Sequence, residues 1–339
     1  MIPLGLSGSD ILRLMINGFW ISQALHVAAT LGLADLLRDG PQTADHLATR
    51  CGAHGPSLYR LLRALASLRI FAEDSRGRFE LTPLAEHLRT DAPSSHAAWA
   101  IWSGQKPTWA MWGELLHCIR TGEAGFSKAY GTAVWDYYAA HPEQNAIFNA
   151  AMTGTSRAEA EILADSYDFS RIHSLVDVGG GEGVLLAVLL AANPAMRGIL
   201  FDQPHVVSGA KAVLESAGVA HRSEIRSGDF FRAVPSGADA YVLKSIVHDW
   251  DDPQAEAILT TCRRVMSQDG RVLLIERVIP PGNEFHPSKL GDLLMFVMYG
   301  GRERTAEEFE QLYARVGLRL ASITPTPAAG RSIIEGVPV

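Results

Sequence analysis

A histidine beside a run of acidic residues is the stretch of this sequence with the clearest capacity for chemistry. His248 opens the segment His-Asp-Trp-Asp-Asp, directly after an apolar run that predicts a strand over 239–245. A neutral imidazole with its usual pKa of about 6.5 can take a proton from a hydroxyl group while that oxygen attacks another atom. The ring must also be held in one orientation, and Glu276 and Glu303 are the candidate carboxylates. The pattern therefore predicts a general base with an acidic partner.

Structural roles also account for these residues. A single histidine can be an ordinary core residue, and Asp249, Asp251 and Asp252 lie just before Pro253, where a helix is expected to begin. Asp252 is the predicted N-cap, with proline in the first helical position. The same acids could be magnesium ligands, but capping already explains Asp252, and no spaced Asp or Asn partner is evident. No metal is therefore expected.

A glycine turn earlier in the chain is predicted to hold a cofactor. The apolar run Leu175 to Val178 predicts a buried strand. It is followed by Gly179, Gly180, Gly181 and Gly183, an apolar helical run from Val184 to Ala192, and a second strand that ends at Asp202. This order of elements holds a nucleotide-like cofactor at the carboxyl edge of a parallel sheet. Glycine lets the backbone approach the ligand, and the acid accepts hydrogen bonds from ribose hydroxyls.

The residues around the glycines indicate the kind of cofactor. The dinucleotide fingerprint requires a third glycine where this chain has Val184. Asp177 precedes the turn, and Glu182 lies at the start of the helix. A carboxylate there suits a cationic sulfonium or ammonium group better than a pyrophosphate. A nicotinamide-dependent dehydrogenase is therefore the less favoured alternative.

Three further residues follow the next strands at the same edge. Asp229 is placed to accept a hydrogen bond from an adenine amino group while Phe230 packs on the ring, and Lys244 lies near the end of the fourth strand. Alone, Asp202 and Asp229 are explained as turn residues and Lys244 as a solvated strand end. In phase with the glycine turn, they favour a cofactor site.

Composition narrows the class of protein. The chain has 339 residues, 47% of them hydrophobic, which is enough for two domains. Its formal net charge of −7 argues against a nucleic-acid or anionic-membrane partner. The three cysteines show no metal spacing, and the longest apolar run, Val184 to Ala192, is too short to span a membrane. No basic and apolar leader opens the sequence, so a cytoplasmic protein is expected.

The N-terminal region predicts helices followed by a hairpin. One helix is expected over Asp10 to Leu37, buried on both sides either in the core or against a second copy of the chain. A helix capped by Thr43, a second helix with Leu58, Leu61, Leu62, Leu65 and Leu68 inward, and two strands around Ser75-Arg76-Gly77 resemble a winged helix. A metabolite-sensing DNA-binding regulator is thus a second alternative. It is disfavoured because residues 1–90 hold nine arginines against eight acidic residues.

A tryptophan-rich run and a long helix are predicted next. Trp99, Trp102, Trp109 and Trp112 recur at near-helical intervals, which is typical of a core stripe and also of a wall for a flat aromatic ligand. Gly122 to Gly131 is predicted to be a loop. A helix from Pro142 to Ser166 is expected to join two domains.

Strand and helix then alternate to the end of the chain. Strands are predicted at 174–178, 198–201, 222–226, 239–245, 271–278, 319–324 and 331–336, and helices at about 183–192, 205–217, 253–267 and 306–316. Thr305 and Glu308 form a predicted capping box. Regular alternation predicts a parallel, doubly wound sheet.

Taken together, the motifs carry a family resemblance over nearly the whole chain. In order they are LVDVGGGEG, ILFDQPHVV, GDFF, VLKSIVHDWDD, LLIE and GGRERT. The sequence resembles the plant caffeate-type and the bacterial antibiotic and pigment O-methyltransferases, which use S-adenosylmethionine (SAM). The resemblance implies a Rossmann-like class I methyltransferase fold of α/β type, with a seven-stranded sheet and an N-terminal winged-helix-like dimerisation domain. The implied domains are 1–100 for dimerisation, 101–165 as a helical linker to the substrate pocket, and 166–339 for SAM binding.

The resemblance also implies roles for individual residues. His248 would be the base, oriented by Glu276 and Glu303. The residues implied in SAM binding are Asp177, Gly179, Gly181, Glu182, Asp202, Gln203, Asp229, Phe230, Lys244, Ser245 and Arg157. Those implied in the acceptor pocket are Met152, Trp99, Trp102, Asp249, Met295, Met298 and Tyr299. The expected reaction is methylation of a small, hydroxylated, aromatic metabolite by a homodimer, yielding S-adenosylhomocysteine. Some members of the family methylate nitrogen or carbon or have lost methyl transfer, so these acceptors stay open.

Overall fold

The computed structural model describes residues 7–339, which form two compact units. The first contains the chain up to residue 109 together with 142–155, and the second contains 110–141 and 156–339. Helix α11 (Pro142–Asp165) therefore contributes to both. Within residues 7–339, no helix combines the length and apolar character needed to cross a bilayer.

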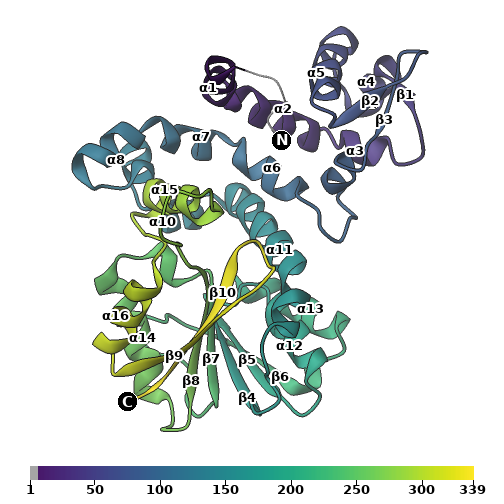
Figure 1. Ribbon diagram of the computed structural model, residues 1–339. Helices are drawn as coiled ribbons and strands as arrows, with labels where there is room; N and C mark the ends of the chain where they lie inside the picture. The colour runs from purple at the N-terminus through teal and green to yellow at the C-terminus, as the bar shows by residue number, and fades with distance from the viewer. Residues whose placement is uncertain (1–6) are drawn as a thin grey trace. The chain divides into compact units, whose positions relative to one another are not determined.

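The second unit is built on a seven-stranded sheet, as predicted (Figure 1). Its strands are β4 (Ser174–Val178), β5 (Arg197–Asp202), β6 (Ser223–Ser227), β7 (Ala240–Lys244), β8 (Arg271–Arg277), β9 (Leu318–Pro325) and β10 (Arg331–Pro338). They lie in the order β6-β5-β4-β7-β8-β10-β9. Strand β10 runs antiparallel to both of its neighbours, and β4, β5, β6, β7 and β8 are parallel.

The strand order reverses at β4, which lies between β5 and β7. The chain leaves β4 for β5 and β6 on one side and later returns to β7 on the other. In open α/β sheets, ligands bind at such a switch point, outside the carboxyl ends of the strands. That edge carries the glycine turn, Asp202 and Lys244.

Helices cover both faces of the sheet (Figure 1). On one face are α12 (Val184–Ala192) and α13 (Ala210–Ser216), and on the other are α14 (Asp252–Val265) and α16 (Ala306–Arg315). Side chains alternate along each strand, so Leu175 packs in the first layer and Val176 in the second. Burial on both faces explains the continuous apolar runs that marked these strands in the sequence.

Several predicted boundaries in this unit are wrong. Asp251, not Asp252, is the N-cap of α14, because its side chain accepts from the Gln254 N–H. The helix predicted over 205–217 is a 3-10 turn, η2 (Val207–Gly209), followed by α13. Helix α15 (Pro287–Tyr299) was not predicted. The capping box of Thr305 and Glu308 is confirmed.

The segment before the sheet is more helical than predicted. Its helices are α7 (Lys106–Gly113), α8 (Leu115–Thr121), α9 (Gly125–Tyr130) and α10 (Val134–Ala140). The prediction of a loop over Gly122 to Gly131 is wrong, because α9 fills its centre. Gly122 and Gly131 have a left-handed φ, 80° and 70°, and they are the C-caps of α8 and α9.

The first unit has helices around a three-stranded sheet. Its elements are α1 (Gly8–Ile16), α2 (Gly18–Thr30), α3 (Leu33–Leu36), β1 (Gln42–Thr43), α4 (Ala44–Cys51), α5 (Gly55–Ser67), β2 (Phe71–Glu73), β3 (Arg78–Leu81), η1 (Ala85–Leu88) and α6 (Ala97–Ser103). The helix after Thr43 and the hairpin around residues 75–77 are confirmed. Leu68 is exposed, not inward as predicted, because α5 ends at Ser67.

The single helix predicted over Asp10 to Leu37 is wrong. The chain breaks at Asn17 and again at Gly32, where φ is 62°. Helix α1 buries none of its residues, and in α2 only Ala28 and Ala29 are buried. Of the two alternatives for this segment, an ordinary core helix of one chain is therefore wrong for α1, and packing against a second copy stays a prediction.

Candidate active site

A short turn after β7 carries His248. Ser245 has a left-handed φ of 57°, which bends the chain out of the sheet into the 3-10 turn η4 (Val247–Asp249). The Ser245 N–H donates to the Ile275 carbonyl at 3.1 Å. The bend therefore places His248 at the carboxyl end of β8, beside Glu276. A non-glycine residue in this region of φ is uncommon and often marks a functional site.

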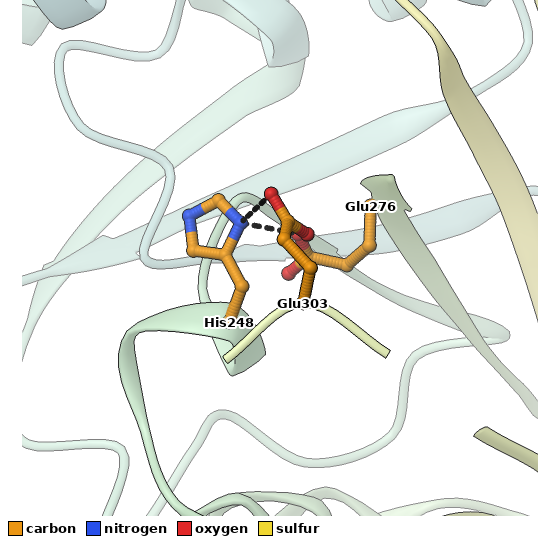
Figure 2. A group of neighbouring side chains, drawn as sticks. All are labelled: His248, Glu276 and Glu303. Carbon is orange, nitrogen blue, oxygen red and sulfur yellow. Dashed lines mark ion pairs between the residues drawn. The ribbon is translucent and has the colours of Figure 1, made fainter. Parts of the chain in front are cut away.

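Glu276 contacts the backbone of this turn, and its carboxylate also faces the His248 ring (Figure 2). Its Oε1 accepts the N–H groups of Ile246 and Val247, each at 3.0 Å. Its Oε2 lies 2.9 Å from His248 Nδ1, an ion-pair distance at which the ring N–H does not point directly at the oxygen. Glu303 Oε1 lies 3.7 Å from the same nitrogen. The structure thus brings together the three residues that the sequence singled out.

The carboxylates change the charge state of the histidine. Burial lowers the pKa of His248, but Glu276, Glu303 and Asp249 outweigh burial and raise it to about 10. Burial also opposes ionisation of Glu276, yet the His248 ring holds the pKa of Glu276 below its usual value. The expectation of an imidazole near pKa 6.5 is therefore wrong, because a ring with a pKa of about 10 is positively charged at pH 7.

Asp249 lies on the opposite side of the ring. Its Oδ1 is 3.4 Å from His248 Nε2, and both side chains are buried. Burial raises the pKa of Asp249 to about 7, against the lowering effect of His248. The ring therefore has acids at both nitrogens, and an acceptor that reaches Nε2 approaches beside Asp249.

The spacing of these ligand atoms would also suit a metal ion. Atoms of His248, Glu276 and Glu303 all lie within 4.8 Å of one another. A cation is already present, however, because Arg277 Nη1 lies 3.6 Å from Glu303 Oε1. Its positive charge opposes a divalent ion at the same carboxylate.

The glycine turn and Asp202 form the neighbouring half of the site. Gly179, Gly181 and Gly183 all have left-handed φ, between 63° and 80°. The Gly181 N–H donates to Asp202 Oδ2 at 2.8 Å, and the Gln203 N–H donates to Oδ1 at 2.6 Å. Each carboxylate oxygen has two lone pairs, so Asp202 retains acceptor capacity for ribose hydroxyls.

Buried polar atoms at this edge fit SAM. Asp177 is buried, its Oδ2 accepts no hydrogen bond within residues 7–339, and burial and Asp202 raise its pKa to about 7. Ser245 Oγ also has no partner there. Two buried acids repel a pyrophosphate and attract a sulfonium or ammonium group. The residues present therefore fit a cationic cofactor with ribose hydroxyls.

The other predicted cofactor residues have different surroundings. Phe230 lies near Gly179 and packs against Phe231 and Trp250. Asp229 caps its own loop by accepting from the Phe231 N–H at 2.9 Å. Glu182 lies beside Gly209. Arg157 is exposed on α11.

Lys244 has a protein partner that the sequence did not reveal. Its Nζ lies 3.0 Å from Glu159 Oε2 and donates to Ser156 Oγ at 3.2 Å. Arg331 Nε donates to the same Glu159 oxygen at 2.8 Å. Burial and Arg331 lower the pKa of Lys244 to about 8, against the effect of Glu159. Glu159 and Arg331 lie 172 positions apart, and no local pattern links them.

The predicted acceptor residues fall in both units. In the second unit, Met295 and Met298 are buried on α15, and Tyr299 stacks on Trp135 with ring centroids 5.2 Å apart. In the first unit, Trp102 is buried between Trp99 and Phe148, at 4.8 and 6.2 Å. Met152 is half-buried in the same unit.

Comparison with known proteins identifies the family of the chain. The O-methyltransferase domain matches residues 112–319, and the O-methyltransferase dimerisation domain matches residues 14–91. The phenazine O-methyltransferase PhzM of Lysobacter antibioticus is 44% identical over 98% of this chain and 96% of its own. The 8-amino-8-demethylriboflavin N,N-dimethyltransferase of Streptomyces davaonensis is 35% identical over 90% of this chain and 88% of its own.

Solved structures share the fold. The crystal structure of LaPhzM has a TM-score of 0.94 at 43% identity, covering 98% of this chain and all of its own. The neocarzinostatin O-methyltransferase NcsB1, in complex with SAM and 2-hydroxy-5-methyl naphthoic acid, has a TM-score of 0.81 at 34% identity, covering 94% and 96%.

Fold and site together define a class I methyltransferase whose cofactor is SAM. The chain belongs to the O-methyltransferase family that carries an N-terminal dimerisation domain. It is a SAM-dependent enzyme of small-molecule secondary metabolism. The predicted fold class, family and cofactor are confirmed, and a SAM-dependent methyltransferase replaces the dehydrogenase alternative.

Proposed function

We propose that this enzyme methylates a hydroxyl oxygen of a small aromatic metabolite, with His248 as the general base. The observation that carries the proposal is the arrangement around the ring. Glu276 and Glu303 both face Nδ1, which leaves Nε2 as the nitrogen for the acceptor. A base held in one orientation contributes roughly a hundredfold or more to the rate.

Different residues of the chain are proposed to bind the cofactor, hold the acceptor and accept its proton. Bound SAM supplies an electrophilic methyl group, which passes to the acceptor oxygen as its bond to sulfur breaks. In enzyme molecules whose His248 ring is neutral, the hydroxyl proton passes to Nε2, and the acids at Nδ1 stabilise the imidazolium that forms. Holding the acceptor in line contributes up to about 7–11 kcal/mol. Asp177, Asp202 and the glycine turn are proposed to bind the cofactor.

The names of the relatives support an aromatic acceptor. The phenazine O-methyltransferase acts on a flat tricyclic ring system, and the NcsB1 complex holds a naphthoic acid. Tyr299 and Trp135 supply stacked aromatic rings in this chain, and burial together with the negative charge of Asp249 raises the pKa of Tyr299. We propose a flat, hydroxylated, polycyclic substrate that packs against aromatic side chains.

Nitrogen methylation is the second candidate. The riboflavin-type relative is an N,N-dimethyltransferase at 35% identity, so the fold accepts amines. An aromatic amine loses its proton readily after methylation and needs no strong base before it. A methylation rate that depends on His248 therefore favours a hydroxyl acceptor, and a rate that does not depend on it favours an amine.

We also propose that the chain forms a homodimer through α1 and α2. The dimerisation domain matches this region, and its helices expose a set of large apolar side chains. These are Leu12, Met15, Ile16, Phe19 and Trp20, each 52–65% exposed. Such a cluster marks an interaction surface on a protein of this kind.

The test is methyl transfer from isotopically labelled SAM to a panel of hydroxylated and aminated aromatics, followed by mass spectrometry. His248→Ala is expected to bind SAM as the parent does and to lose about a hundredfold or more in turnover of hydroxyl acceptors. Unchanged turnover would remove His248 as the base. Label on amines alone would favour the second candidate.

A further inference from the structure

Arg304 is buried beneath the catalytic turn, and no step of the reaction uses it. Its side chain is 1% exposed. The guanidinium Nη1 donates to the Val247 carbonyl at 2.9 Å, and Nη2 donates to the Trp250 carbonyl at 3.1 Å. Nε and Nη2 also donate to Asp252 Oδ1, at 3.1 and 2.8 Å. Burying this charge is costly unless each donor finds an acceptor, and here the acceptors include two carbonyls that flank His248 and Asp249 and the Asp252 carboxylate.

The two carbonyls bracket the residues that face the acceptor. Val247 immediately precedes His248, and Trp250 immediately follows Asp249. The turn η4 is only three residues long, so it has little internal hydrogen bonding to fix its shape. Glu276 holds its entry through the N–H groups of Ile246 and Val247. Arg304 donates to the Trp250 carbonyl just after the turn, so hydrogen bonds fix both ends of η4.

The residues next to Arg304 contact the same turn. The Arg302 N–H donates to the His248 carbonyl at 2.8 Å, and Glu303 faces the His248 ring. A methyl group added at Gly301 would overlap the backbone of His248 and Asp249. Residues 301–304 therefore pack against η4 as one segment. Glu303 orients the His248 ring, and Arg304 holds the backbone of the turn.

We propose that Arg304 is a positioning residue for methyl transfer. Its planar fork holds the η4 backbone in the one arrangement in which Nδ1 faces the acids and Nε2 faces the acceptor. The inference rests on the proposed role of His248 as the base. A lysine at this position keeps the charge but cannot reach the two carbonyls and Asp252 together, because it presents one nitrogen instead of a rigid fork.

The test is a double-mutant cycle on the full-length enzyme, with Arg304→Lys and His248→Ala made singly and together. Arg304→Lys is expected to lower kcat about a hundredfold, because a displacement of about 1 Å has this effect, and to leave the calorimetric SAM affinity unchanged. In the His248→Ala background it is expected to have little further effect, since the group it positions is gone. Arg315→Lys is the matched control: Arg315 also pairs with Asp252 but is more exposed and reaches no carbonyl of the turn.

Each outcome decides the proposal. Normal kcat in a folded Arg304→Lys variant overturns it. An equal loss in both backgrounds also overturns it, because Arg304 then acts independently of His248. A His248→Ala variant with full activity overturns the base assignment itself, a result distinct from either of these. If Arg304→Lys does not fold, Gly301→Ala displaces the same turn without removing a charge, and a full kcat with the displaced turn overturns the proposal.

Discussion

Lys244 and Glu159 form a buried ion pair that joins the end of β7 to helix α11. Their Nζ and Oε2 atoms are 3.0 Å apart, and the side chains are 9% and 5% exposed. Arg331 of β10 shares the same oxygen. Two cations and one anion thus meet in the interior beside the proposed cofactor edge. The pair gives Lys244 a structural role in addition to the cofactor contact proposed for it.

Glu159→Ala is expected to destabilise the protein by about 3–5 kcal/mol, because it leaves Lys244 and Arg331 buried without their shared anion. The measurement is the free energy of unfolding in urea. Glu161→Gln is the control, since Glu161 is exposed on the same helix. A loss below about 1 kcal/mol, the value typical of a surface pair, would show that Lys244 and Arg331 find other partners.

The pH dependence of kcat/KM is expected to have its rising limb at alkaline pH. A general base must be neutral, and the pKa of His248 in the free site is about 10. The rate should therefore increase from pH 7 toward pH 10. Asp249, with a pKa of about 7, completes its ionisation in the lower part of that range. A limb centred near the ordinary histidine pKa of about 6.5 would contradict the influence of the three acids on the ring.

Glu303→Gln is expected to move that limb to lower pH. Glu303 raises the pKa of His248 through its charge, and its removal lowers the pKa of the ring in the folded protein. Lowering the pKa of His248 in the folded protein should also lower the free energy of unfolding. A raised folded pKa stabilises the protein fully below the unfolded value of about 6.5, and the benefit is lost as pH rises through about 10. Urea unfolding at pH 6 should therefore show a loss in the variant that diminishes at pH 10.

Asp202→Ala is expected to weaken SAM binding while turnover at saturating SAM is less affected. The substitution removes the proposed ribose acceptor and also the two hydrogen bonds from Gly181 and Gln203 that shape the turn. Each lost hydrogen bond to a charged group is worth about 1.5–3 kcal/mol, so a weakening of tenfold or more is expected. Calorimetric titration gives the affinity. A curve that matches the parent would rule out the ribose role.

The sequence predicted best those features that have a local signal, such as a strand followed by a turn or a charged residue. The central strands β4, β5, β7 and β8 were predictable because each is largely apolar and buried, whereas β6 is mostly exposed and has no such run. Glu276 and Glu303 were predictable as partners of His248 because Glu276 lies near the end of β8 and Glu303 follows two glycines. Glu159 and Arg304 were not, since their partners come from elements distant in sequence. Helix α15 did have a local signal, because His286 caps it and Pro287 begins it.

The exposed apolar face of α1 and α2 is expected to form the dimer interface. Ile16 and Trp20 are 65% and 62% exposed, and α1 buries none of its residues within one chain. Placing a charge there should abolish association without unfolding the unit, because these side chains do not contribute to its core. Ile16→Glu with Trp20→Glu is expected to convert a dimer to a monomer in light scattering coupled to size-exclusion chromatography. Leu84→Glu, at an exposed leucine after β3, is the control and should remain dimeric. A parent protein that is monomeric at micromolar concentration, or a double variant that remains dimeric, would place the dimer interface elsewhere or remove it.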